Sequence, residues 1–325
     1  MFDSFGKQLR VTIFGSSHAE RIGVVIEGVP SGVALSVDMF AEDLNRRRPS
    51  LRGETTRTEE DIPTIEGLSC GRTTGEPITI SFRNSNFRSK DYAHLRRQPR
   101  PSHADLVQLR KYGKDYDLAG GGRASGRMTV ALVAVGVVAK QIIPEVKFTT
   151  SLVSVGGSTN SDEFEKIIAD AARDGDSVGG VVECIAKGVA HSLGEPFFDS
   201  VESLISHLLF SVPGVKGVEF GDGFAGAAKR GSERNDQIID SLGHTLSNNE
   251  GGINGGITNG EDVVLRVAIK PTPSIAREQQ SFDFERGAVA PLVIGGRHDA
   301  CIARRAQVVV EAMVALALAE LKLRA

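Results

Sequence analysis

Residues 124–142 read ASGRMTVALVAVGVVAKQI, and this stretch decides the fold. Beyond Arg127 it is apolar on nearly every face of a helix with 3.6 residues per turn, which predicts a helix that is buried all round. Residues 300–323, ACIARRAQVVVEAMVALALAELKL, predict a second long and mostly apolar helix. Helices that expose no face to water need other layers on both sides, so we expect sheets to cover them.

Segments with strand character lie before the first of these two helices and between the two in the sequence. Alternating or β-branched patterns predict strands at residues 9–15, 22–28, 77–82, 179–190 and 262–269. Two shorter helices are predicted at residues 36–47, with Ser36 as the N-cap, and at residues 200–210. Strands and helices do not alternate regularly, which favours an α+β fold with helices sandwiched between sheets.

The chain contains no linker, low-complexity tract or internal repeat, so we expect residues 1–325 to form a single domain. Three stretches, at residues 46–75, 83–122 and 243–261, show little periodicity. Aperiodic segments of this length inside a compact domain tend to be functional. The sequence therefore predicts an active site built largely from loops.

Composition argues against several classes of protein. No apolar run reaches the roughly 18 residues that suggest a membrane span, and we expect no signal peptide. The three cysteines, Cys70, Cys184 and Cys301, form no C-x-x-C pair. Neither a disulfide framework nor a metal site is therefore predicted, and a reducing cytoplasm fits best.

Charge is unevenly distributed along the chain. Residues 41–127 hold 17 Lys and Arg against 12 Asp and Glu, although the whole chain carries a net charge of −3. A local positive field in a near-neutral protein suits a small anionic ligand better than a polyanion. A nucleic-acid binder that uses Arg46, Arg47 and Arg48 is an alternative, but the acidic remainder and the lack of interleaved aromatic residues count against it.

The segment GGGR at residues 120–123 precedes a predicted helix whose first turn contains Ser125 and Arg127. Free backbone N–H groups and the dipole at a helix N-terminus form an anion site, and arginine forks strengthen it. The spacing imitates a phosphate loop but lacks the lysine and hydroxyl residue that such a loop requires. The simpler interpretation is a glycine turn that only starts a helix.

Two histidines lie in turns that glycine or proline stiffens, close to basic residues. His18 follows a predicted strand in GSSHAE, and His103 lies in RPSHAD, two residues before Asp105. Histidine suits proton transfer at neutral pH because its unperturbed pKa is about 6.5. Both are candidate acid/base groups, although a loop histidine is more often a plain surface residue.

A set of motifs in order along nearly the whole chain closely resembles the chorismate synthase family. They read GSSHAERIGVVIEGVP, RRRP, NSNFRSKDY, RPSHADL, KYGKDYDLAGGGRASGR, FGDGFAGA, NNEGGINGGITNG, KPTPSI and GGRHDACIARRA. The resemblance implies a β-α-β sandwich, a homotetramer and reduced FMN as cofactor. It implies a carbon–oxygen lyase that eliminates phosphate from 5-enolpyruvylshikimate 3-phosphate in an anti-1,4 reaction, giving chorismate for aromatic amino acid biosynthesis.

The resemblance also assigns roles to individual residues. His18 would protonate the departing phosphate, His103 would protonate or stabilise the reduced flavin, and Asp299 would assist removal of the C6 hydrogen. The expected flavin contacts are Arg123, Ala124, Ser125, Pro213, Gly214, Gly255, Lys270, Pro271, Thr272, Pro273, Ser274 and Arg297. The residues expected near substrate or NADPH are Arg46, Arg47, Arg48, Arg52 and Arg127.

The chain departs from the family pattern inside motifs that matter. The departures are Ser16 for an acidic residue, Ala19 for glycine, Ala124, Gly126 and Met128 for Ser, Ala and Glu, Pro273 for a small hydroxyl residue, and RHDAC without its proline. A flavin- or phosphate-binding paralogue without this activity is therefore the alternative. No separate reductase domain is visible, so we expect a separate flavin reductase to supply reduced flavin, with NADPH as the other candidate reductant.

Overall fold

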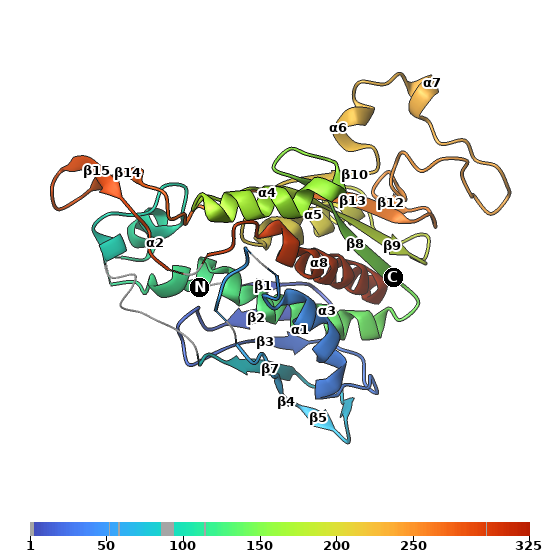
Figure 1. The fold of residues 1–325 in the computed structure, drawn as a ribbon. Helices are drawn as coiled ribbons and strands as arrows, with labels where there is room; N and C mark the ends of the chain where they lie inside the picture. The colour runs from blue at the N-terminus through green and yellow to red at the C-terminus, as the bar shows by residue number, and fades with distance from the viewer. Residues whose placement is uncertain (1–2, 52, 58, 86–93, 114, 297) are drawn as a thin grey trace.

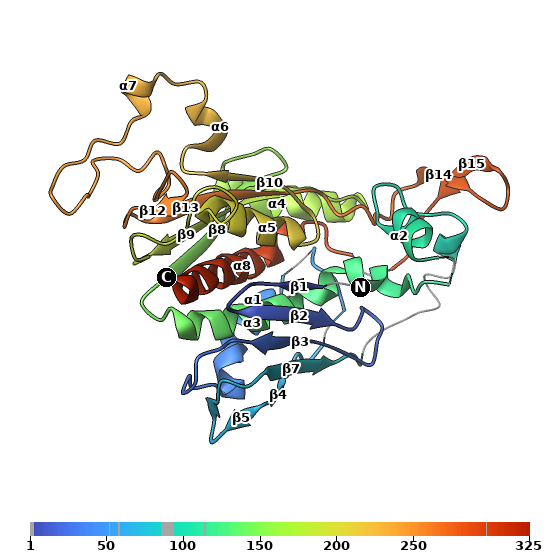
Figure 2. The same ribbon diagram turned by 180° about the vertical axis from the view of Figure 1, so that it is seen from behind.

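Two sheets enclose a layer of helices in the computed structural model of the chain (Figures 1 and 2). The structure describes residues 3–51, 53–57, 59–85, 94–113, 115–296 and 298–325. The structure confirms the expected α+β architecture, in which buried helices are sandwiched between sheets.

The first sheet has the strand order β1-β2-β3-β7-β4, and each neighbouring pair is antiparallel. Its strands are β1 (Ser4–Phe5), β2 (Arg10–Phe14), β3 (Arg21–Glu27), β7 (Ile78–Arg83) and β4 (Thr64–Glu66). On the central pair, Val24 lies opposite Ile80 and both are fully buried. These aliphatic side chains pack toward the helical layer, which is how a half-buried sheet removes its apolar face from water.

The second sheet has the order β10-β13-β9-β8 and is also antiparallel. Its strands are β10 (Val215–Phe220), β13 (Val263–Ile269), β9 (Gly180–Lys187) and β8 (Lys147–Val155). On β13 every second residue, from Val263 to Ile269, is buried, as the alternating sequence predicts for one covered face. The five predicted strands correspond to β2, β3, β7, β9 and β13, so those predictions are confirmed.

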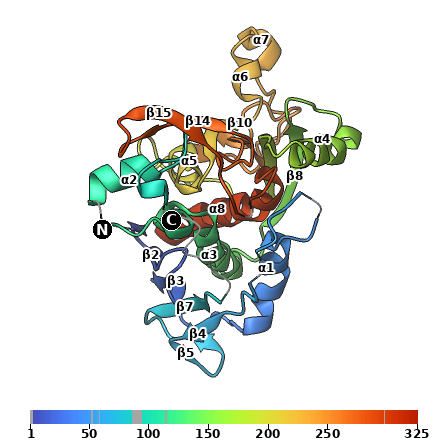
Figure 3. The ribbon, with the colours of Figure 1, turned by 60° about the vertical axis from the view of Figure 1, so that its left-hand side comes forward.

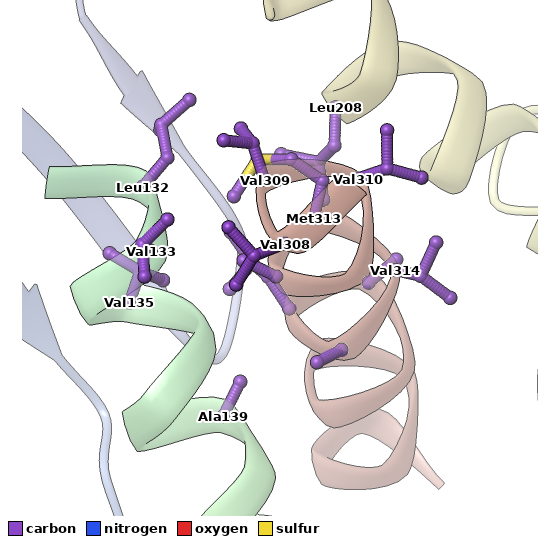
Figure 4. Packing of buried hydrophobic residues seen from close by; sticks show 14 of the residues in the cluster. Leu132, Val133, Val135, Ala139, Leu208, Val308, Val309, Val310, Met313 and Val314 are labelled. Atoms are coloured by element: carbon purple, nitrogen blue, oxygen red, sulfur yellow. The ribbon is translucent and has the colours of Figure 1, made fainter. Parts of the chain in front are cut away.

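The helices α3 (Thr129–Ile142) and α8 (Ala303–Arg324) run side by side between the sheets, and Figure 4 shows their valine, leucine and methionine side chains interlocking. A β-carbon added to Gly136 would lie 2.3 Å from that of Ala312, so the two backbones touch where a larger residue would not fit. Two shorter helices, α1 (Ala41–Arg47) and α5 (Val201–Ser211), flank this pair.

The remaining elements lie around this sandwich. They are η1 (Val37–Phe40), α2 (Asp105–Tyr112), η3 (Ala119–Ala124), η4 (Gly126–Met128), α4 (Ser161–Arg173), α6 (Gly223–Gly226), α7 (Gly231–Arg234) and the hairpins β5-β6 (Leu68–Ser69, Arg72–Thr73), β11-β12 (Ile253–Asn254, Ile257–Thr258) and β14-β15 (Gln279–Asp283, Ala288–Leu292). The segment with α6 and α7 projects from the body on one side, and β14-β15 lies toward the other (Figure 1).

Three details of the sequence prediction were wrong. The helix expected from residue 124 begins at Thr129, because residues 120–122 have positive φ and Ser125 is extended, so short 3₁₀ turns replace its first turn. Ser36 occupies the N-cap position of η1, but its side chain makes no capping hydrogen bond. The stretch 83–122, which lacks a clear period, contains the helix α2.

Among the described residues, no helix is long and apolar enough to cross a membrane. No group of three or more His, Cys, Asp and Glu there could hold a metal ion.

A buried carboxylate near the end of α8 ties the two chain ends together. Glu320 is fully buried and accepts the backbone N–H groups of Lys7 at 2.7 Å, Gln8 at 3.1 Å and Leu9 at 2.5 Å. It also pairs with the guanidinium of Arg324, at 2.7 Å. Burial alone would raise the pKa of Glu320, but these donors lower it overall.

Replacing Glu320 with glutamine is expected to lower the free energy of unfolding by about 1.5–3 kcal/mol at pH 7, since hydrogen bonds to a charged group are lost. A lowered pKa stabilises the fold above the ordinary glutamate pKa of about 4.3, and that contribution disappears as the pH falls through the folded-state pKa. The free energies of unfolding in urea of wild type and variant should therefore differ at pH 7 and become equal in acid. Glu278→Gln, at an exposed position, is the control, and an equal loss in both variants would contradict the prediction.

Candidate active site

A cavity of about 580 Å³ opens where the central helices begin. Its walls come from six loop regions and from the first turns of α8, and they include Thr55, His103, Ser125, Pro213 and Asp299. The N-terminal end of α8 faces this space, and so does that of α3 through the turn that precedes it. Figure 3 brings forward the side of the molecule on which these helices start. The positive ends of two long helices favour an anionic occupant.

Two arginines in the wall share one carboxylate. Asp61 accepts from Arg47 Nη1 at 3.2 Å and from Arg127 Nη1, and Arg127 Nε donates to Asn84 Oδ1 at 3.0 Å. Burial lowers the pKa of Arg47 to about 9, Asp61 opposes this, and the nearby charges of Arg127 and Arg305 add to it. Arg47 therefore remains charged at neutral pH, and a further negative charge nearby would stabilise this charged form.

Two guanidinium nitrogens in the cavity wall are buried without a hydrogen-bond partner among the described residues. They are Arg48 Nε and Arg127 Nη2. Buried donors of this kind are rare because each one costs free energy when it is left unsatisfied. An anion in the cavity would satisfy both.

The GSSHAE turn is fixed against the glycine turn. The backbone N–H of Ser17 donates to Gly122 O at 3.1 Å, and Arg57 Nη1 donates to Ser17 Oγ at 3.2 Å. A β-carbon on Gly120, whose φ is +60°, would lie 2.6 Å from His18 Nε2. Glycine at position 120 therefore lets His18 approach the backbone at the edge of the cavity.

His103 lies across the same glycine turn, with its Nε2 atom 3.6 Å from where a β-carbon on Gly121 would be. Its Nδ1 atom lies 2.8 Å from Asp105 Oδ1, and Asp105 is also bound by Arg100 through Nε and Nη2 at 2.7 Å each. Burial lowers the pKa of His103, although the hydrogen bond to Asp105 opposes the shift. The pKa of Asp105 is lowered as well, because Arg100 and His103 outweigh its burial.

Together these contacts define the state of His103. The lowered pKa favours the uncharged ring at neutral pH, with Nδ1 2.8 Å from Asp105 Oδ1 and Nε2 facing the glycine turn. The loop at residues 270–274 supports this arrangement, since Lys270 Nζ donates to Ser102 O at 2.8 Å and Ser274 Oγ accepts from Arg100 at 3.0 Å.

Asp299 lies just before α8 and is held from three directions. Its carboxylate accepts from Arg305 Nη1 at 2.9 and 3.1 Å and from the backbone N–H of Thr55 at 3.0 Å. Its backbone carbonyl accepts from Thr272 Oγ1 at 2.8 Å. His298, the preceding residue, also lines the cavity, and burial lowers its pKa.

Most of the residues expected in the site from the sequence line this one cavity. They are Arg47, Arg48, His103, Arg123, Ala124, Ser125, Arg127, Pro213, Gly214, Lys270, Thr272, Pro273, Ser274 and Asp299. Arg52 and Arg297 lie outside the described residues. Pro271 and His18 border the lining, next to Thr272 and Gly120 respectively.

Arg46 and Gly255 do not lie with the others. The guanidinium of Arg46 binds Glu311 at 2.7 and 3.0 Å and Thr150 at 2.9 Å, between α1, α8 and β8. Gly255 lies in the turn of the β11-β12 hairpin, on the side of the molecule away from α2 (Figures 1 and 2).

The guanidinium of Arg123 is bound by oxygen atoms of the protein, which is not the arrangement expected of a residue that only binds phosphate. Its guanidinium donates to Gly15 O at 3.1 Å and Ile13 O at 3.0 Å, and it also pairs with Asp3. It therefore fixes the glycine turn to the end of β2, while the turn itself faces the cavity.

Several cavity residues were missed by the sequence analysis. Arg57, Asp61 and Arg305 all line the space. Arg305 stands inside the quoted motif GGRHDACIARRA. Asp61 had no local signal, because a single aspartate in an aperiodic loop does not reveal which arginines it will meet.

Replacing Gly126 with alanine is expected to raise the free energy of unfolding by about 0.4–1 kcal/mol, because alanine restricts the unfolded chain. Gly126 does not have a positive φ, and a β-carbon there would meet open space. Denaturant unfolding measures the change. Gly121→Ala is the matched control: its φ of +87° should make alanine destabilising there, and equal effects of both changes would contradict this reasoning.

Comparisons with known proteins agree on one family. A family model described as chorismate synthase matches residues 9–323. A chorismate synthase of Chitinophaga pinensis is 49% identical over 323 residues, covering 99% of this chain and 96% of the relative. One of Archaeoglobus fulgidus is 42% identical and covers 98% of this chain and 96% of the relative. A crystal structure titled as a chorismate synthase matches with a TM-score of 0.75 and 28% identity, covering 98% of this chain and 93% of the other.

Proposed function

The chain belongs to the chorismate synthase family of phosphate lyases, which convert 5-enolpyruvylshikimate 3-phosphate to chorismate in the shikimate pathway, and from this premise we propose how its cavity carries out the reaction. The reaction breaks the C3–O bond to phosphate and the C6–H bond. The electrons of the C–H bond form part of the new diene, phosphate leaves with the C–O pair, and one proton must go to a base.

The first proposed task of the cavity is to bind a substrate with one phosphate and two carboxylates. The observation that carries this proposal is the pair of buried guanidinium nitrogens, Arg48 Nε and Arg127 Nη2, that lack a partner among the described residues. Arg47 lies beside Arg127 on the shared carboxylate of Asp61. These three arginines supply fixed donors at the positive ends of two helices, which suits charge-assisted binding of oxyanions.

The second proposed task is to hold reduced FMN. The cavity has a volume within the usual range for small-molecule sites, roughly 300–1,000 Å³, and an apolar wall of Val212, Pro213, Ile302 and Val309 that can face a flat ring. We propose that Ser125 and the loop at residues 270–274 contact the cofactor, and that Arg123 fixes the turn on which Ser125 stands. The chemistry that reduced FMN supplies when bound is transient electron donation, which is recovered within the turnover.

The third proposed task is to move protons. His18, at the edge of the cavity beside Gly120, would donate to the departing phosphate. Neutral His103 would take up a proton at Nε2 when a bound anion raises its pKa, while Asp105 holds the ring through Nδ1. Asp299 would receive the proton that leaves C6. We do not include Arg46 in the site, since its guanidinium is bound by Glu311.

The activity itself has a direct test. The purified chain would be mixed with substrate and photoreduced FMN without oxygen, and we expect phosphate release together with the absorbance of chorismate. Binding of FMN without either product would instead support the paralogue without this activity, which the departures at Ser16 and Ala19 suggested.

The source of reduced flavin is a separate proposal. We propose that a separate flavin reductase, or another external reductant, supplies it, because the described residues form one sandwich of sheets and helices in which no reductase unit stands apart. An anaerobic assay with substrate and FMN, in which NADPH is the only reductant, should then give no turnover. Chorismate formation under those conditions would show that the chain reduces flavin itself.

We further propose a homotetramer, as the family resemblance implies, and a location in the cytoplasm, which the scattered cysteines favour. Large apolar side chains are exposed on the projecting segment, including Phe224, Leu242 and Leu246, with exposed fractions of 82%, 81% and 71%. Apolar surface of this kind commonly marks a contact with another chain. Light scattering of the purified protein would give the number of copies.

A further inference from the structure

Arg305 lies in the first turn of α8 and contacts two parts of the cavity wall. Its Nη1 atom donates to Asp299 Oδ1 at 3.1 Å and to Oδ2 at 2.9 Å. Its Nε atom donates to the backbone carbonyl of Arg47 at 2.8 Å. One guanidinium therefore joins the residue before α8 to the end of α1.

Both members of this ion pair are largely withdrawn from water. The side chains of Arg305 and Asp299 are 17% and 13% exposed, and both line the cavity. Surface ion pairs contribute little, but a pair at this depth is less screened and its geometry is better defined. The carboxylate of Asp299 also accepts the backbone N–H of Thr55, so donors from two segments fix its orientation.

The bonding of Arg305 differs from that of the other arginines in the cavity. Arg48 and Arg127 each keep a buried nitrogen without a partner among the described residues, whereas Arg305 Nε and Nη1 are both used on protein oxygens. Its contacts suit holding a carboxylate in place better than binding a substrate anion. A reacting group that is displaced by about 1 Å can lose roughly 10²-fold in rate, so such holding matters.

We propose that Arg305 is a positioning residue for the elimination. It holds the carboxylate of Asp299 at the cavity wall and ties it to the backbone of Arg47, so that the group that handles the C6 proton keeps a fixed separation from the arginines that bind the substrate. The inference rests on the proposed role of Asp299.

A double-mutant cycle tests this inference. The variants are Arg305→Gln, Asp299→Asn and the two together, assayed without oxygen with photoreduced FMN. Arg305→Gln is expected to lower kcat by roughly 10-fold to 100-fold while KM changes by less than about two-fold, because the substrate-binding arginines stay in place. In the double variant kcat should fall no further than in Asp299→Asn. Arg305 acts through the carboxylate of Asp299, so its removal has no further effect once that carboxylate is gone.

Arg304→Gln is the matched control. Arg304 is the neighbouring arginine on α8, but it pairs with Glu54 and Glu165 and does not line the cavity. Its kcat and KM should equal those of the wild type. If Arg305→Gln lowers the melting temperature more than the control does, Arg305→Lys is measured as well, and its kcat should lie between those of wild type and Arg305→Gln.

Three results would overturn the inference. A raised KM with unchanged kcat would make Arg305 a substrate ligand, additive losses in the cycle would separate it from Asp299, and a kcat equal to that of Arg304→Gln would leave it no role. Failure of the proposed function would give other results. The wild type would be inactive, or Asp299→Asn would be fully active, whatever residue stands at position 305.

Discussion

Replacing His103 with alanine is expected to lower turnover by roughly 10²–10⁴-fold, the usual contribution of a side chain that moves a proton in the transition state. The ring is held by Asp105 at 2.8 Å and lies against the glycine turn that borders the cavity. Alanine removes the imidazole but leaves Asp105 paired with Arg100 at 2.7 Å, so the loop retains its main ion pair. The loss of turnover should therefore come from the missing imidazole and not from a disturbed loop.

The measurement is kcat with saturating substrate and photoreduced FMN in the absence of oxygen. His244→Ala is the control, because His244 is exposed on the projecting segment and pairs there with the nearby Asp240 at 2.6 Å. That variant should behave as wild type. A near-normal kcat for His103→Ala would refute a role in proton transfer.

Asp61→Asn is expected to lower the free energy of unfolding by about 3–5 kcal/mol, because it leaves buried charges without their counter-charge. Asp61 lies between Arg47 and Arg127, and all three side chains are at most 6% exposed. The pKa of Arg47 is already lowered to about 9 by burial, and Asp61 is the main influence that opposes this. Without the carboxylate, two guanidinium groups would face each other in the core.

Asparagine is the appropriate replacement because the φ of Asp61 is 49°, a left-handed conformation that asparagine tolerates. The substitution therefore removes the charge while keeping shape and backbone. Chemical unfolding at neutral pH gives the loss, and Glu60→Gln, one residue earlier and exposed, is the control. A loss of less than about 1 kcal/mol would mean that the two arginines find other partners.

The order of motifs allowed much of the site to be predicted before the structure was considered. Asp299 is far in sequence from His103, Ser125 and Arg127, yet all four line one cavity, as the resemblance implied. The roles assigned to them remain predictions that the experiments above address. What the motifs did not reveal is how these groups are held, because Asp61 and Arg305 act through partners on distant segments.

Arg46 and Arg47 illustrate this limit most directly. They are consecutive on α1, and the sequence placed both near the substrate. In the structure Arg46 binds Glu311 at 2.7 Å, while Arg47 binds Asp61 at 3.2 Å and lines the cavity. Successive residues on a helix point about 100° apart, so only the surroundings of α1 decide which of the two faces the site.

The sequence by itself determined the central layer of this protein. Residues 129–142 are apolar on nearly every face and residues 303–321 are mostly apolar, so both helices must be largely enclosed by other layers. Only the tertiary structure decided which charged groups meet at the helix ends. Burial preference is a property of each residue and leaves a local pattern, whereas an ion pair such as Asp299–Arg305 or Asp61–Arg127 depends on where two segments come to lie, and no local pattern records that.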